Sequence, residues 1–295
     1  MEIGWTKVHP FLFRCSTSKL LTKLLYSAIL SLFQKYLKGL ETMNILILDT
    51  ETTAIEPNKC FCYNLGMVIH DTETNSALEA KDFVITQVWD NLPLFESAYY
   101  KDKRPLYVSA MRARKARKEK WGYVCQEMKR DIKKYNVQSC YAYNSPFDDN
   151  VISFNCNWYH TQNPIETIPI FDIRGYAHKW LCDEEYFAYC EANSLFTESG
   201  NYSTTAEAMT RYIRQDNTFM EEHTALSDSI IETEILMECL RRGGELAKEY
   251  PVVRSFPRLT RTPFTIKVNE EIIYQGEYVK KYIRNNTYSF TTPGE

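Results

Sequence analysis

Residues 45–53 read Ile45-Leu46-Ile47-Leu48-Asp49-Thr50-Glu51-Thr52-Thr53, an apolar run that ends in two carboxylates. A continuous apolar run of this length is typical of a buried strand at the centre of a sheet. Because side chains on a strand alternate between its two faces, Asp49 and Glu51 point the same way. Two carboxylates on one face repel each other unless a cation lies between them, and hard oxygen ligands favour Mg²⁺ or Mn²⁺. The stretch therefore predicts a central strand with a divalent-cation site at its end.

Two further acidic clusters follow downstream. In the stretch Tyr141-Ala142-Tyr143-Asn144-Ser145-Pro146-Phe147-Asp148-Asp149-Asn150, a short strand leads into a helix whose first turn holds Asp148. In His223-Thr224-Ala225-Leu226-Ser227-Asp228, a loop histidine precedes a helix that carries an aspartate. A separation of five residues does not stack His223 and Asp228 on one helical face, so they converge only if His223 lies before the helix. With the first strand, these clusters predict one site.

The composition is that of an ordinary soluble globular protein, with 44% hydrophobic and 25% charged residues. The net charge of −3 gives no overall attraction to nucleic acid or acidic membranes, so any such binding must come from local patches. Nine cysteines without a C-x-x-C pair are typical of the reducing cytoplasm and argue against a disulfide framework. The expected localisation is therefore cytoplasmic.

We expect three segments along the chain. Residues 1–42 are basic and apolar, and their uncharged stretch Leu24–Gln34 is too short to span a bilayer. We interpret them as an upstream extension outside the native protein, with Met43 as the start; a signal peptide and an amphipathic membrane-surface helix are the alternatives. Residues 43–244 are expected to form an α/β domain, a mixed five-stranded sheet flanked by helices. Residues 245–295 are expected to add a small C-terminal β-hairpin.

The pattern of the chain predicts individual elements. After the first strand, strands are expected over Phe61–His70, Asp82–Val88, Ser139–Tyr143 and Pro169–Ile173, with a turn at Asp71–Asn75. Helical structure is expected over 90–135, from Ser145-Pro146, and over about 174–192, 204–215 (with a capping box at Thr204-Thr205-Ala206-Glu207) and 224–242. The last helix should stop at Gly243-Gly244. The hairpin strands are expected within Phe264–Val268, Glu271–Tyr274 and Tyr278–Ile283.

The three clusters resemble the three motifs of the DEDDh (DnaQ-like) 3′–5′ exonucleases, the proofreading-subunit and RNase T type on an RNase H-like fold. The resemblance covers about residues 44–240, with the motifs in the family's order. The compact size and the 90–135 insertion resemble bacteriophage-encoded members. There are two departures from the family's pattern: Ala54 stands where the family often has glycine, and Asp149 adds an acid beside Asp148.

The resemblance implies a role for each matching residue. It makes His223 the general base that takes a proton from water. Two divalent ions, Mg²⁺ with Mn²⁺ as a substitute, would be held by Asp49, Glu51, Asp148 and Asp228. The implied substrate-binding residues are Thr52, Thr53, Phe147 and Asn144. Of these, Thr52 would lie near the terminal 3′-hydroxyl, Phe147 would pack on the terminal nucleotides, and Asn144 would shape the strand–helix junction.

The implied activity is hydrolysis of single-stranded nucleic acid from its 3′ end to nucleoside monophosphates, with DNA favoured over RNA. An exoribonuclease or oligoribonuclease is the alternative within the class. A catalytically idle nucleic-acid-binding module on the same fold is a second alternative, which the complete set of four carboxylates and a histidine argues against. A protein anchored by residues 1–42 is a third, although we expect no stable membrane association. The host cytoplasm would be the location of a phage-encoded member, and a homodimer is open because dimers occur among relatives.

Three other features have competing interpretations. Between Lys101 and Lys120 there are nine Lys or Arg against two acids, which fits a solvated helix face or a phosphate-contacting flap with nearby aromatic residues for base stacking. Cys60-Phe61-Cys62 with His70 fits no standard zinc spacing. Asp172, at the end of the fifth expected strand, is interpreted as a helix cap and not as a metal ligand.

Overall fold

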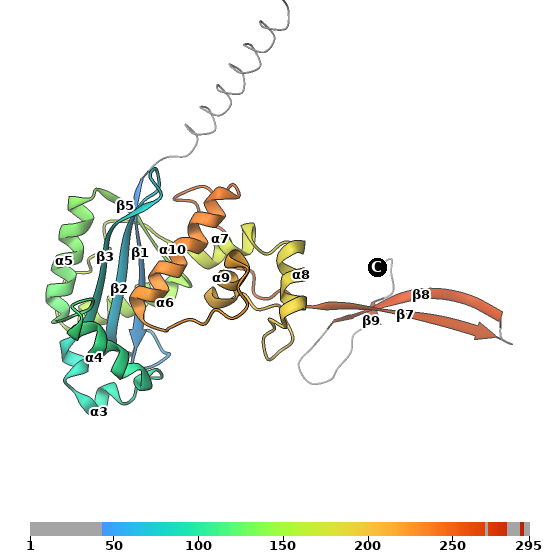
Figure 1. Ribbon diagram of the computed structural model, residues 1–295, viewed down its shortest axis with the longest axis horizontal. Helices are drawn as coiled ribbons and strands as arrows, with labels where there is room; N and C mark the ends of the chain where they lie inside the picture. The colour runs from blue at the N-terminus through green and yellow to red at the C-terminus, as the bar shows by residue number, and fades with distance from the viewer. Residues whose placement is uncertain (1–42, 269–270, 282–289, 292–295) are drawn as a thin grey trace, which may run out of the picture. The chain divides into compact units, whose positions relative to one another are not determined.

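The structure is a computed structural model that describes residues 43–268, 271–281 and 290–291 of the chain (Figure 1). The expectations for residues 1–42 lie outside these described residues. Side chains are described up to residue 258. Among the described helices, none combines the length and apolarity needed to cross a membrane.

A mixed sheet forms the centre of the fold, in the order β4-β3-β2-β1-β5-β6. Pairs β1–β2 and β2–β3 are antiparallel, whereas β3–β4, β1–β5 and β5–β6 are parallel. The strands are β1 (Asn44–Thr52), β2 (Cys62–Asp71), β3 (Ser76–Ile85), β4 (Arg117–Glu119), β5 (Val137–Ala142) and β6 (Ile170–Asp172). The expected mixed sheet with an interior first strand is confirmed, but it has six strands and not five.

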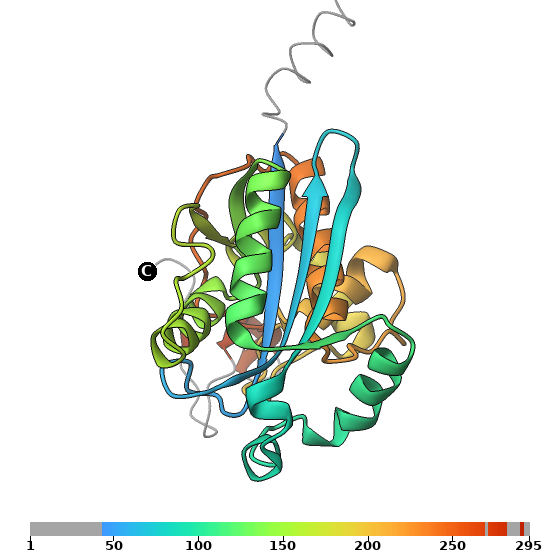
Figure 2. The same ribbon diagram turned by 90° about the vertical axis from the view of Figure 1, so that its left-hand side faces the viewer.

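Helices cover both faces of this sheet, as Figures 1 and 2 show for α5 on one side and α10 on the other. On one face Leu46 and Leu48 of β1 pack with residues of α5 and α6. On the opposite face Ile45 and Ile47 pack with residues of α7, α9 and α10. The helices are α2 (Thr86–Trp89), α3 (Leu92–Phe95), the 3₁₀ helix η1 (Lys101–Lys103), α4 (Arg104–Arg112), α5 (Trp121–Lys134), α6 (Ser145–Trp158), α7 (Ile173–Trp180), α8 (Glu184–Asn193), α9 (Ala206–Arg214) and α10 (Ala225–Arg241).

The expectation of helical structure throughout 90–135 is wrong in its middle. The chain turns at Arg114, whose φ is +58°, and residues 117–119 then form β4 beside β3. The open edge of β3 offers backbone hydrogen bonds that outweigh the helix propensity of this Ala-, Arg- and Lys-rich stretch. The Arg117 guanidinium donates to Glu127 Oε1 (2.5 Å) and lies 5.0 Å from the centre of the Phe83 ring, which holds the short strand in place.

Two other boundaries differ from expectation. The helix expected over about 174–192 is two helices, because the Asp183 side chain accepts a hydrogen bond from the Tyr186 backbone N–H (2.9 Å) and caps a new start. Strand β3 begins at Ser76, before the expected Asp82, since its early half extends the hairpin with β2. The strand ends at Ile85, and the residues after it that were expected to continue the strand to Val88 belong to helix α2.

The tail forms a small sheet of its own. Strands β7 (Leu259–Val268) and β8 (Glu271–Lys281) pair in an antiparallel hairpin, and β9 (Phe290–Thr291) adds to β8. Strand β7 is longer than the expected Phe264–Val268, and the two segments expected at Glu271–Tyr274 and Tyr278–Ile283 are one strand, β8, with the end of the second outside the described residues. Strand β9 was not predicted.

Candidate active site

The end of β1 carries the first two acidic residues. Asp49 and Glu51 follow Ile45 and Ile47 at two-residue intervals, so they continue the face of β1 that packs against α10. Glu51 is 8% exposed, and its Oε2 accepts a hydrogen bond from Tyr63 Oη (3.5 Å). A buried strand therefore presents both carboxyl groups to the start of one helix.

Helix α10 approaches the sheet closely because Gly66 of β2 has no side chain. A Cβ at Gly66 would lie 2.1 Å from the carbonyl carbon of Ala225, the first residue of α10. The Ala225 backbone N–H donates to Asn64 Oδ1 (2.8 Å), which attaches the helix start to β2. This contact brings Asp228, in the first turn of α10, to the end of β1.

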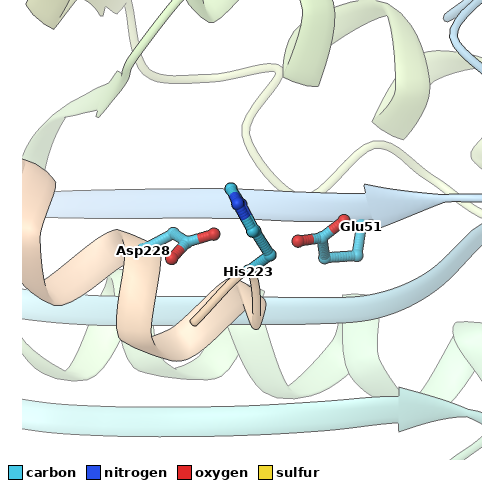
Figure 3. Close-up of side chains that lie close together, drawn as sticks. All are labelled: Glu51, His223 and Asp228. Atoms are coloured by element: carbon cyan, nitrogen blue, oxygen red, sulfur yellow. The ribbon is translucent and has the colours of Figure 1, made fainter. Parts of the chain in front are cut away.

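Glu51, His223 and Asp228 meet at this point, as Figure 3 shows. One potential ligand atom from each side chain lies within 4.8 Å of the others. His223 lies in the loop before α10, as the spacing of the third cluster required, and its backbone has a φ of +53°. Glu51 of β1 therefore shares one site with two residues from the start of α10, far away in the sequence.

Asp148 joins the site from the first turn of α6. It is 2% exposed, and its Oδ1 accepts a hydrogen bond from Thr50 Oγ1 (2.7 Å), between the two acidic residues of β1. Burial raises the pKa of Asp49 well above its ordinary range, and the charge of Asp148 is the next cause. Asp49 and Asp148 thus lie near enough for their charges to act on the site, although the ligand atoms within 4.8 Å of one another belong to Glu51, His223 and Asp228.

Each of these carboxyl groups holds its proton more tightly than an exposed acid. Burial, and then the charge of Asp228, raise the pKa of Glu51 to about 9. The pKa of Asp228 rises to about 8, mainly by burial, and burial raises that of Asp148 to about 7. Buried oxygen donors that repel one another in their charged form fit a hard divalent cation, which would stabilise that form.

Two further acids belong to the site and were missed by the sequence analysis. Glu232 is 3% exposed, accepts a hydrogen bond from the Tyr143 backbone N–H (3.2 Å), and has a pKa raised by burial and by Asp148. Its position four residues after Asp228 on one helical face was a usable signal. Glu221, whose Oε2 lies 3.8 Å from His223 Nδ1, is in a loop and had no such signal.

Part of the basic run lies beside the histidine. The ring of Tyr100 stacks on the His223 imidazole. Burial, and then the charge of Lys103, lower the pKa of His223. Burial and acidic neighbours raise the pKa of Asp228, and the charge of Lys103 offsets a small part of that rise. Arg117 and Lys118, further along, pair with Glu127 and Asp90. The run therefore has one end at the site and another end engaged in ion pairs.

The four expected substrate-binding residues occupy different environments. Thr52 Oγ1 donates to the Ala54 carbonyl oxygen (2.6 Å), whereas Thr53 Oγ1 accepts from the Phe61 backbone N–H (3.0 Å). Phe147 is half-buried against the core on the α5–α6 face. Asn144, with a φ of +69°, precedes α6 and donates its backbone N–H to Asp172 Oδ1 (2.9 Å).

The structure also shows the surroundings of Asp172 and of the Cys62 and His70 side chains. The Asp172 side chain accepts from the Arg174 backbone N–H (2.9 Å), so it caps α7 as expected. Cys62 begins β2, and His70 lies near the other end of this strand, where its Nε2 is hydrogen-bonded to Asn75 Oδ1 (3.0 Å). In the part of the chain that is described, these two residues do not form a metal-binding group.

No protein-family model and no curated protein matches the chain. Among solved structures, it is similar to exonuclease I in an SSB/exonuclease I structure with the inhibitor CFAM, at 15% identity and a TM-score of 0.48 over 69% of this chain and 42% of that one. It is also similar to the nuclease domain of 3′hExo, a DEDDh family member, bound to rAMP, at 14% identity and a TM-score of 0.46 over 73% of this chain and 98% of that one. A third similar structure is E. coli exonuclease I in complex with a dT13 oligonucleotide, at 17% identity and a TM-score of 0.44 over 68% of this chain and 41% of that one. The chain thus spans less than half of the exonuclease I chains that it matches.

Proposed function

We propose that this protein is a divalent-metal-dependent 3′–5′ exonuclease of the DEDDh type that acts on single-stranded nucleic acid, with DNA favoured. The observation that carries the proposal is the convergence of Glu51, His223 and Asp228 within 4.8 Å, with Asp49 and Asp148 beside them. A buried cluster of carboxyl groups around one imidazole is suited to activating water against a phosphodiester. Its proposed partners are the 3′ ends of DNA or RNA strands in the cytoplasm.

Asp49, Glu51, Asp148 and Asp228 are the proposed ligands for two Mg²⁺ ions, with Mn²⁺ as a substitute. When bound, such ions supply positive charge that stabilises the attacking and leaving oxygens of an in-line phosphoryl displacement. Glu51, Asp148 and Asp228 are buried and Asp49 is half-buried, so water stabilises their charged forms poorly and bound cations would do so instead.

His223 is the proposed general base. Burial, and then the charge of Lys103, lower the pKa of its imidazole, so the ring is neutral and able to accept a proton at physiological pH. As the ring takes the proton from water, the water oxygen forms a bond to phosphorus and the bond from phosphorus to the 3′-oxygen of the preceding nucleotide breaks. The leaving 3′-oxygen takes a proton from solvent water, and the imidazole later returns its own proton to solvent. The products are a nucleoside 5′-monophosphate and a strand with a new 3′-hydroxyl.

The test uses the full chain with 5′-labelled single-stranded DNA and RNA of matched sequence, in Mg²⁺ or EDTA. We expect a ladder that shortens from the 3′ end in Mg²⁺ only, with circular single-stranded DNA left intact. His223→Asn should slow cleavage by about 10²- to 10⁴-fold. Relative rates on the two substrates would identify the preferred sugar.

Asp148→Asn and Asp149→Asn form a matched pair for the metal-ligand assignment. Asp148 is buried in the site, whereas Asp149 is half-exposed on the next position of α6. We expect Asp148→Asn to abolish cleavage and Asp149→Asn to retain it. Intact substrates that are nevertheless retarded in a gel by the wild type would contradict the enzyme and favour a binding module.

A further inference from the structure

A residue that stacks on the His223 ring comes from a segment outside the three acidic clusters. Tyr100 precedes η1, and its ring stacks on the His223 imidazole with centroids 4.4 Å apart and planes 11° from parallel. Such a face-to-face contact restricts rotation of both rings about their side-chain bonds. It leaves the edge of the imidazole, where both nitrogens lie, free to face other groups.

His223 needs external support because its backbone conformation is unfavourable. A φ of +53° lies in the left-handed region, which is uncommon for residues other than glycine. Tyr107 Oη donates to the His223 carbonyl oxygen (3.4 Å), which holds the backbone. The Tyr100 ring covers one face of the imidazole, and Glu221 Oε2 lies 3.8 Å from its Nδ1, so these contacts limit where the side chain points.

The segment that supplies these contacts is firmly attached to the sheet. Tyr107 is 1% exposed, and its ring packs edge-on against those of Tyr63 (5.8 Å) and Trp89 (6.0 Å). Tyr63 also donates to Glu51. Tyr100 is joined to the same segment by a hydrogen bond from the Lys103 backbone N–H to its carbonyl oxygen (2.9 Å). A rigid support therefore extends from β2 to the histidine.

We propose that Tyr100 is a positioning residue for His223: its ring holds the imidazole over the space between Glu51 and Asp228. This inference rests on the proposed function, in which that imidazole accepts a proton from water. Since positioning acts on the chemical step, removal of the ring should lower kcat and leave substrate affinity unchanged. A platform for a substrate base, the other use of an aromatic ring at a nuclease site, would instead raise KM and the dissociation constant.

The kinetic test compares Tyr100→Leu, Tyr100→Phe and the control Tyr99→Leu in the full chain. Tyr99 is 77% exposed, and its ring packs edge-on against Tyr100 (4.8 Å between centroids), so this control removes an adjacent ring but keeps the ring that stacks on His223. We expect Tyr100→Leu to lower kcat by about 10- to 100-fold with KM unchanged. Tyr100→Phe keeps the stacked ring and should stay within about 2-fold of the wild type, as should Tyr99→Leu. A rise in KM at constant kcat would overturn the inference, as would equal losses in Tyr100→Leu and Tyr99→Leu.

A second readout needs neither activity nor metal. In EDTA, the ring-proton NMR signal of His223 is the one of the five histidine signals that disappears in His223→Gln. A ring stacked at 4.4 Å shifts this signal upfield, and Tyr100→Leu should abolish the shift while Tyr100→Phe and Tyr99→Leu preserve it. An unchanged signal in folded Tyr100→Leu would refute the positioning role. If the wild type cleaves no substrate, the proposed function fails, and this shift alone still decides whether Tyr100 stacks on the imidazole.

Discussion

At the scale of single residues, the site contains a buried acid, Glu232, in addition to the four carboxyl groups expected to bind metal. Burial is the first cause of the raised pKa values of Asp49, Glu51, Asp148 and Asp228. Repulsion by the other carboxyl groups of this set adds to it for Asp49 and Glu51, whereas Glu221 adds to it for Asp228. Glu232 increases this repulsion, since its charge acts on Asp49 and its own pKa is raised by Asp148 and Asp228. It therefore adds attraction for a cation and destabilises the metal-free protein.

Glu232→Gln separates these two effects. The amide oxygen of Gln can still accept the Tyr143 N–H hydrogen bond, but the side chain carries no charge. We expect the metal-free variant to be more stable than the wild type at pH 8, by about 1 kcal/mol. Thermal unfolding in EDTA measures this gain, and calorimetric titration should show weaker Mg²⁺ binding. Asp149→Asn is the control that removes a nearby half-exposed charge. Lower stability of Glu232→Gln in EDTA would contradict this account.

At the scale of elements, the approach of α10 to β2 decides where His223 and Asp228 lie. Gly66→Ala would place a Cβ 2.1 Å from a backbone atom of Ala225, so the helix start has to move. We expect a loss of about 3 kcal/mol of unfolding free energy, measured by urea denaturation, together with loss of cleavage. Gly122→Ala is the matched control, since its Cβ would lie 3.4 Å from Thr161 Cγ2, an ordinary contact. Wild-type rates for Gly66→Ala would show that the close approach does not position the site.

The basic run gives a second prediction at this scale. Lys103 is near enough to the site for its charge to act on His223 and Asp228, whereas Lys101, at the start of the same 3₁₀ helix, is exposed. If Lys103 contacts a substrate phosphate, Lys103→Gln should weaken oligonucleotide binding and reduce the slope of log affinity against log salt by about 1. Lys101→Gln should change neither quantity. Equal effects of both variants would indicate a solvated basic face without a specific contact.

At the scale of the whole molecule, the raised pKa values link stability to pH and to metal. Glu51 and Asp228, with pKa values of about 9 and about 8, bind more protons in the folded protein than in the unfolded chain at neutral pH. Stability of the metal-free protein must then fall as pH rises through this range, because the folded state has to release those protons.

We therefore expect the Tm in EDTA to decrease between pH 6.5 and pH 9. Mg²⁺ or Mn²⁺ should raise the Tm strongly at pH 8 and weakly at pH 5, where the carboxyl groups are protonated. Differential scanning calorimetry across this range, with and without metal, measures both effects. His178, whose pKa burial lowers to about 4, changes its charge mainly below pH 6.5 and so outside this window. A Tm that rises with pH in EDTA would show that the carboxyl cluster is not strained.

The sequence by itself determined the central strand, the shared face of Asp49 and Glu51, and the three acidic clusters that meet at its end. These features follow from local patterns: the two-residue period of a strand, the apolar run of β1, and the signals that start α6 and α10. Only the tertiary structure decided the sixth strand, which depends on the free edge of β3, and the stacking of Tyr100 on His223. It also added Glu221 and Glu232 to the site. The reason is that such contacts join distant segments, and no local pattern encodes them. The hydrogen bond from Tyr107 to His223, for example, joins residues that are 116 positions apart.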